Sequence, residues 1–130
     1  MRTKSFKDLI VWQKSYKLVL ETYKITKDFP KEEAYGLSQQ MRRSAVSIPS
    51  NISEGYGRQY HKEYRQFLSM AYSSLCELET QYLLSIDLSY TTKNEAVDNL
   101  MKETGSMLYR MLNPIRYPLP ANSIIHEIQR

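Results

Sequence analysis

Apolar side chains recur every three or four positions along most of the chain, the spacing that gathers them on one face of an α-helix. This spacing predicts three helices over residues 7–27, 37–57 and 61–89, and a fourth that follows a cap at Thr92 and ends near Ile115. No alternating segment flanked by turn residues predicts a strand. The chain is therefore predicted to be all-α.

The first predicted helix carries an apolar stripe that we expect to face the interior of the protein. The stripe consists of Leu9, Trp12, Tyr16, Val19, Leu20 and Tyr23. Ser5 is a candidate N-cap for this helix. The pair Phe29-Pro30 ends the helix, because the residue before a proline is pushed out of the α region.

Two local signals refine the later helices. Pro49 lies inside the second predicted helix, where it removes one backbone donor and presses on the carbonyl of Ala45, so a kink is expected there. Thr92 and Glu95 have the spacing of a capping box, which predicts the start of the fourth helix. The third helix has the most regular pattern, with apolar residues about every 3.5 positions.

Four amphipathic helices joined by short connections pack side by side with their apolar stripes inward. We therefore predict an antiparallel up-down-up-down four-helix bundle with a proline-kinked second helix. The bundle is expected to occupy residues 1–117 and a C-terminal tail residues 118–130. Three isoleucines give the tail enough apolar surface for a short helical piece: Ile124, Ile125 and Ile128.

The composition excludes several classes of protein. Hydrophobic residues make up 42% of the chain and charged residues 25%, which is typical of a folded globular domain. No apolar run approaches the roughly 20 residues that cross a bilayer, and the N-terminus lacks the apolar core of a secretory signal. We expect a cytoplasmic protein without a membrane partner.

The chain offers few residues for metal or acid–base chemistry. It has one cysteine, Cys76, which excludes an internal disulfide and a multi-thiolate zinc site. Di-iron bundles use Glu-x-x-His pairs, but Arg58 and Ser123 stand three residues before His61 and His126. We expect no cofactor, no metal and no enzymatic activity.

Positive charge is concentrated in the first half of the chain. Residues 1–65 carry 13 Lys and Arg against 7 Asp and Glu, whereas residues 66–130 carry 5 against 7. Five basic residues cluster around the second helix and the following turn: Arg42, Arg43, Arg58, Lys62 and Arg65. Tyr56, Tyr60 and Tyr64 lie nearby in sequence. Basic and aromatic side chains together suit phosphate contacts and base stacking, although a solvated face with tyrosines at a subunit contact gives the same pattern.

The second predicted helix also has a polar face of small residues. Ser47, Asn51 and Glu54 are three or four positions apart, so they share one side of the helix. One interpretation is a polar contact between helices inside the bundle. The other is a functional polar site, including a weak enzyme hypothesis built on Asn51 and Glu54.

Several motifs resemble those of the 23S ribosomal RNA intervening-sequence protein family. They are Phe6-x-x-Leu9-x-Val11-Trp12, Phe29-Pro30-x-Glu32, the run from Gln40 through Ser47-Ile48-Pro49-Ser50-Asn51-Ile52 to Gly55, and Phe67-Leu68-x-x-Ala71-x-x-Ser74-Leu75-x-Glu77-Leu78-Glu79. The resemblance covers about residues 5–115. It implies a bacterial antiparallel four-helix bundle that assembles into a ring-shaped homopentamer.

A similar bundle is the accessory protein of diversity-generating retroelements, where a basic pentamer binds nucleic acid and a reverse transcriptase. The resemblance therefore implies three partners for this chain: further copies of itself, RNA or DNA, and a reverse transcriptase.

Two functional hypotheses follow. The first is a non-enzymatic oligomeric bundle that binds RNA or DNA through its basic second helix and the following turn. The second is a structural or assembly protein that acts through protein–protein contacts without binding nucleic acid.

Overall fold

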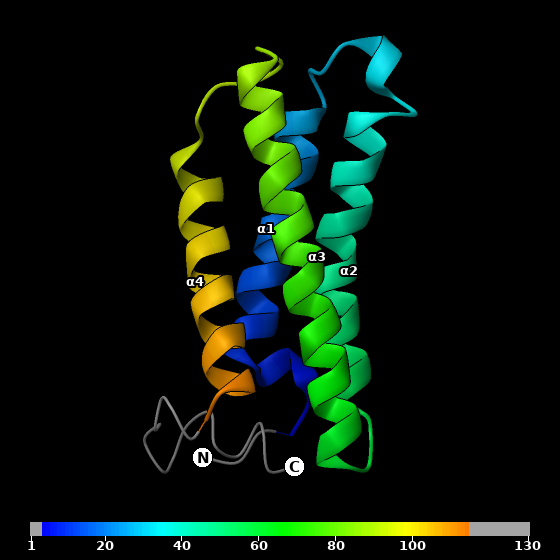
Figure 1. Cartoon of the computed structure of the whole chain (residues 1–130), viewed down its shortest axis with the longest axis vertical. Helices are drawn as coiled ribbons and strands as arrows, with labels where there is room; N and C mark the ends of the chain where they lie inside the picture. The colour runs from blue at the N-terminus through cyan, green and yellow to red at the C-terminus, as the bar shows by residue number, and fades with distance from the viewer. Residues whose placement is uncertain (1–3, 115–130) are drawn as a thin grey trace.

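The computed structural model describes residues 4–114, which form six helical elements (Figure 1). In chain order they are η1 (Phe6–Asp8), α1 (Ile10–Thr26), η2 (Lys31–Glu33), α2 (Leu37–Tyr56), α3 (His61–Asp87) and α4 (Glu95–Leu112). The described part of the chain contains no strand. The predicted all-α class and the four long helices are confirmed, while the tail 118–130 lies outside the described residues.

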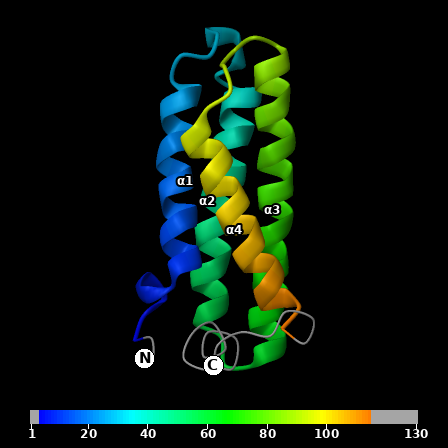
Figure 2. The same ribbon diagram turned by 90° about the vertical axis from the view of Figure 1, so that its left-hand side faces the viewer.

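Each long helix packs against two others. α2 packs against α1 and α3, and α4 packs against the same two helices from the other side. The colour sequence in Figure 1 passes up α1, down α2, up α3 and down α4. Figure 2 shows α4 running obliquely, from beside α1 at one end toward α3 at the other.

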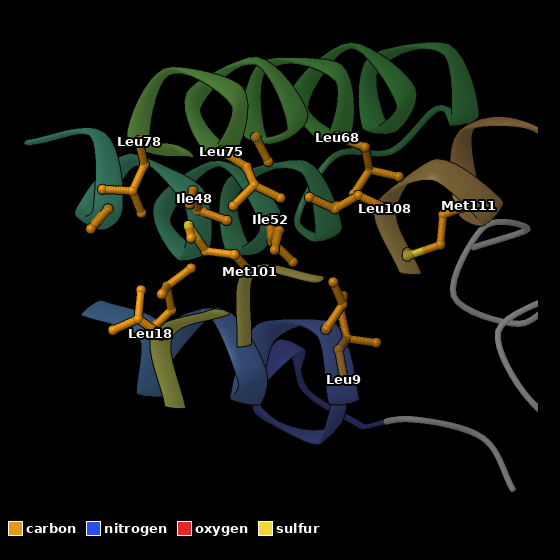
Figure 3. Close-up of a cluster of buried hydrophobic side chains, with 14 of the residues drawn as sticks. Leu9, Leu18, Ile48, Ile52, Leu68, Leu75, Leu78, Met101, Leu108 and Met111 are labelled. Carbon is orange, nitrogen blue, oxygen red and sulfur yellow. The ribbon is translucent and has the colours of Figure 1, made fainter. Parts of the chain in front are cut away.

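The hydrophobic core lies along the common axis of the four helices. Figure 3 shows Leu18 of α1, Ile48 and Ile52 of α2, Leu75 of α3 and Leu108 of α4 converging there. All five side chains are at most 4% exposed. Burying an aliphatic side chain of this size contributes about 1.5–3 kcal/mol, so this seam is the main source of stability.

The predicted inward stripe of α1 is wrong. Tyr16 is 48% exposed, Leu20 51% and Tyr23 43%, and Trp12 is only half-buried. Of the predicted set only Leu9, which precedes the helix, is fully buried. The outer side of α1 is therefore an aromatic and aliphatic stripe, which we call the outer α1 stripe: Trp12, Tyr16, Val19, Leu20 and Tyr23.

Small residues fill the inner side of α1 instead. Ser15, Leu18, Thr22 and Thr26 are buried there. The Thr22 and Thr26 hydroxyls each donate to the carbonyl four residues earlier, both at 2.7 Å, so their burial leaves no unpaired polar atom. A tyrosine hydroxyl needs a partner when it is buried, and its bulk needs more room. The small hydroxyl residues therefore occupy the interior and the tyrosines face outward.

Two predicted caps are also corrected. Ser5 caps the short η1 through the Lys7 N–H, while α1 itself begins after Leu9. α4 begins after Asn94 rather than Thr92, and the Asn94 side chain accepts the Val97 N–H at 3.0 Å. Thr92 and Glu95 have the spacing of a capping box, but they do not cap the helix. Asn94 is held at the start of α4 by the Tyr82 hydroxyl, which accepts its backbone N–H at 2.7 Å.

Candidate nucleic-acid interface

The five predicted basic residues do not form one site. Arg42 and Arg43 lie in the first turns of α2, whereas Arg58, Lys62 and Arg65 follow its other end. From Arg43 to Tyr56 the helix rises about 20 Å at 1.5 Å per residue. The structure therefore divides the predicted cluster into an upper pair and a lower group.

The two arginines of the lower group hold parts of the fold together. Arg58 lies 3.5 Å from the Glu54 carboxylate, and its guanidinium stands 4.7 Å from the centre of the Phe67 ring. Arg65 donates to the carbonyl of Leu112 at 2.6 Å, which satisfies an otherwise open acceptor at the end of α4. Lys62 is exposed at the start of α3. The contacts of Arg58 and Arg65 therefore connect the ends of helices within the fold.

The upper pair is arranged differently. Arg42 donates from Nε to the Thr26 hydroxyl at 2.9 Å, and its guanidinium lies 4.6 Å from the centre of the Tyr23 ring. Arg43 is exposed and has no ion pair or hydrogen bond within residues 4–114. One arginine is thus fixed against an aromatic ring, and its neighbour is available to a ligand.

Two grooves flank this pair. The α1–α2 groove has a volume of about 500 Å³ and is lined by Tyr23, Ala34, Gln39, Arg42, Arg43, Val46 and Ser47. The α2–α3 groove has a volume of about 480 Å³ and is lined by Gln40, Arg43, Ser44, Ser47, Ser74, Glu77 and Gln81. Both grooves share Arg43 and Ser47, so they meet along the outer side of α2.

The polar face of α2 is mainly a contact between helices. The Ser47 and Ser74 hydroxyl oxygens lie 2.8 Å apart and join α2 to α3. The Asn51 amide donates to the Ser47 carbonyl at 2.8 Å and to its hydroxyl at 2.9 Å. Glu54 is exposed and pairs with Arg58 instead. The predicted set of three is therefore split, because only Ser47 and Asn51 belong to this network.

The sequence-based site lacks several residues that line the grooves, among them Tyr23, Glu77 and Gln81. Tyr23 was assigned to the core, and Glu77 and Gln81 lie on α3, far from the arginines in sequence. The cation–aromatic contact of Tyr23 depends on α1 and α2 packing together. No sequence pattern indicates that Glu77 and Gln81 face Arg43.

The Glu33 carboxylate and the Tyr90 hydroxyl form a hydrogen-bonded pair beside the segment that precedes α2. Glu33 accepts the Leu37 N–H at 2.9 Å and the Tyr90 hydroxyl at 2.8 Å, and these two bonds lower the pKa of the Glu33 carboxyl below its ordinary value. The same bond to Glu33 raises the pKa of the Tyr90 hydroxyl. The pair ties the segment before α2 to the end of α3.

Two kinds of feature are absent from the described residues. Within residues 4–114 no group of three or more His, Cys, Asp or Glu residues could hold a metal ion. Over the same residues, none of the helices has both the length and the apolar character needed to cross a membrane. The described structure is that of a four-helix protein with an arginine pair between two surface grooves.

The comparisons with known proteins identify the family of the chain. The sequence model of the 23S rRNA-intervening sequence protein family matches residues 7–113, most of the chain. The chain belongs to this family, as the motifs around Ser47–Gly55 predict. A search of curated proteins gave no match.

Proposed function

We propose that this protein is a non-enzymatic, oligomeric bundle that binds RNA or DNA through the outer side of α2. The observation that carries the proposal is the upper arginine pair. Arg43, whose guanidinium has no ion pair or hydrogen bond to residues 4–114, lies where the two grooves meet, beside Arg42, which contacts the Tyr23 ring. The family's name also associates its members with ribosomal RNA genes.

Physical chemistry supports a polyanionic ligand at this place. A guanidinium binds phosphate oxygens through a planar fork of donors, and Arg42 is held in one geometry before any ligand arrives. The lower group adds positive charge at the other end of α2, including exposed Lys62.

The outer α1 stripe supports the oligomeric part of the proposal. Leu20 and Tyr16 are each about half exposed beside half-buried Trp12 and Val19, so a continuous apolar strip faces outward. An apolar strip of this kind on a small protein indicates a protein contact. We propose a second copy of the chain as its occupant, and the resemblance described above adds the homopentamer as the expected assembly.

The proposed scaffold is an antiparallel up-down-up-down bundle with a bend at Pro49. Short connections at alternate ends of the bundle support the antiparallel order. Pro49 is buried within a helix that continues to Tyr56.

Nucleic-acid binding is tested by fluorescence anisotropy with labelled RNA and DNA oligonucleotides over a salt series. Affinity should fall steeply with salt, because phosphate neutralisation releases counterions. Arg43→Glu should weaken binding at least tenfold at about 0.1 M salt, where exposed charges still act over about 10 Å. Lys102→Glu is the matched control, since it makes the same charge change on exposed α4. Equal loss in both variants, or affinity that is independent of salt, would refute this binding surface.

The second candidate function is assembly without nucleic-acid binding, which the outer α1 stripe favours. Light scattering on the intact chain should show an oligomer that Leu20→Lys dissociates. Ile10→Lys is the matched control, because Ile10 is 55% exposed on the same helix but lies off the stripe. A stable oligomer that binds no RNA or DNA at low salt would establish assembly in place of the leading proposal.

A further inference from the structure

The α2–α3 groove contains charged groups that the fold does not pair. Arg43 on α2 and Glu77 on α3 both line it, yet their charged atoms are more than 4.0 Å apart. Neither side chain has an ion pair or hydrogen bond within residues 4–114. Two opposite charges that line one groove without an ion pair between them are both available to a ligand that bonds to both.

Gln81 adds a buried acceptor at the same groove. Its side chain lines the groove, the residue is 7% exposed, and its Oε1 has no hydrogen-bond partner among the described residues. An unpaired buried polar atom destabilises the folded state, because its hydrogen bonds to water are lost and not replaced. A ligand that donates an N–H to the Gln81 amide would remove this cost.

Hydrogen bonds join the two helices at the floor of the groove. Ser47 and Ser74 bond to each other across the two helices at 2.8 Å, and the Asn51 amide holds Ser47 from the next turn. The spacing of α2 and α3 at the floor is therefore supported before a ligand binds. A rigid planar ligand loses little of its binding energy to ordering such a site.

The groups in the groove specify the ligand's chemistry. The ligand must donate N–H groups to the Glu77 carboxylate and Gln81 Oε1, and it must accept from the Arg43 guanidinium. A phosphate alone would satisfy Arg43 but would be repelled by Glu77. Guanine carries donors and acceptors in one plane. Its N1–H and N2 amino group are donors, and its O6 and N7 are acceptors to which one arginine can donate two hydrogen bonds.

We infer that the α2–α3 groove binds an unstacked guanine base from a single-stranded segment of nucleic acid. The inference rests on the proposed nucleic-acid function and names the base that the site selects. Single-stranded segments expose base edges that a duplex hides. Because Arg43 and Ser47 border both grooves, the strand's backbone passes over α2 beside Arg42 while one base enters the α2–α3 groove.

The test compares oligonucleotides that differ in one base. Labelled oligouridine is measured by anisotropy against the same oligomer with one central guanosine, adenosine or inosine, and a deoxy series repeats the comparison for DNA. The wild-type protein should bind the guanosine oligomer about tenfold more tightly than oligouridine, since a good paired contact to a base gives a discrimination of about 5- to 150-fold. Inosine, which lacks the N2 amino group, should lose part of the preference.

Glu77→Gln should reduce the guanosine preference to less than twofold. Glu79→Gln is the matched control: it makes the same charge change on the same helix, but Glu79 lines a different groove, between α3 and α4. It should keep the full preference. Circular dichroism verifies that both variants are folded.

The outcomes separate this inference from the proposed function. Salt-sensitive binding without a guanosine preference, or equal loss of preference in the two glutamate variants, would overturn the inference and leave the proposed function standing. If no oligonucleotide binds the wild-type protein, both fail together.

Discussion

Replacing Gly55 with alanine tests a close approach between α2 and α3. A Cβ atom at Gly55 would stand 2.7 Å from the Phe67 Cβ and 3.3 Å from the Tyr64 carbonyl oxygen. Both atoms belong to α3 and are fixed to its backbone, so no side-chain rotation relieves the clash. The helices must move apart where α2 ends and α3 begins.

The magnitude follows from two opposing effects. Overpacking a well-packed contact costs about 1–3 kcal/mol, and fixed neighbours favour the upper end of that range. Replacing a glycine with alanine returns at most about 1 kcal/mol through helix propensity, since Gly55 lies in the last turn of α2. The net loss for Gly55→Ala is therefore about 2 kcal/mol, which for a chain of this size lowers Tm by roughly 6–10 °C.

Gly105→Ala is the matched control, because it also lies inside a long helix. A Cβ there would meet only Leu75 Cδ2, at 3.2 Å, the far end of a flexible side chain. The propensity gain should offset the small shift of Leu75, so stability stays within about 1 kcal/mol of wild type or rises. Urea unfolding followed by circular dichroism measures both variants. A Gly55→Ala protein as stable as Gly105→Ala would refute the close approach.

Three further predictions concern the helix ends. Tyr82→Phe should lower the unfolding free energy by about 1–3 kcal/mol, because the Asn94 N–H loses its acceptor; denaturant unfolding measures it. Asn94→Ala should cost about 1 kcal/mol, whereas Thr92→Ala should cost almost nothing, and equal losses would reject Asn94 as the cap. The lowered pKa of Glu33 means that its stabilisation is present above pH 4.5 and is lost as pH falls through the lowered pKa. Glu33→Gln should therefore show a shallower acid decline in Tm than wild type.

The sequence determined the secondary structure with small errors. The helical period, the Phe29-Pro30 stop and the turn after Tyr56 set the end of α1 and both ends of α2 within one residue of prediction and α3 within two, because these signals act within a few neighbouring residues. Buried positions of α2 and α3, such as Ile48 and Leu75, follow the apolar period of each helix, since both helices have one dominant apolar stripe.

The tertiary structure decided which side of α1 is inside. Its outer stripe is more apolar than its inner side, and a sequence pattern alone assigns the larger apolar stripe to the core. The actual choice depends on the space left by α2 and α4, which small residues such as Thr22 fit, and on hydroxyls that bond to their own helix. The same holds for the candidate site: helix length separated Arg43 from Arg58, and packing between α2 and α3 brought Glu77 and Gln81 to Arg43. Such juxtapositions join residues more than 30 positions apart, so only the packed chain determines them.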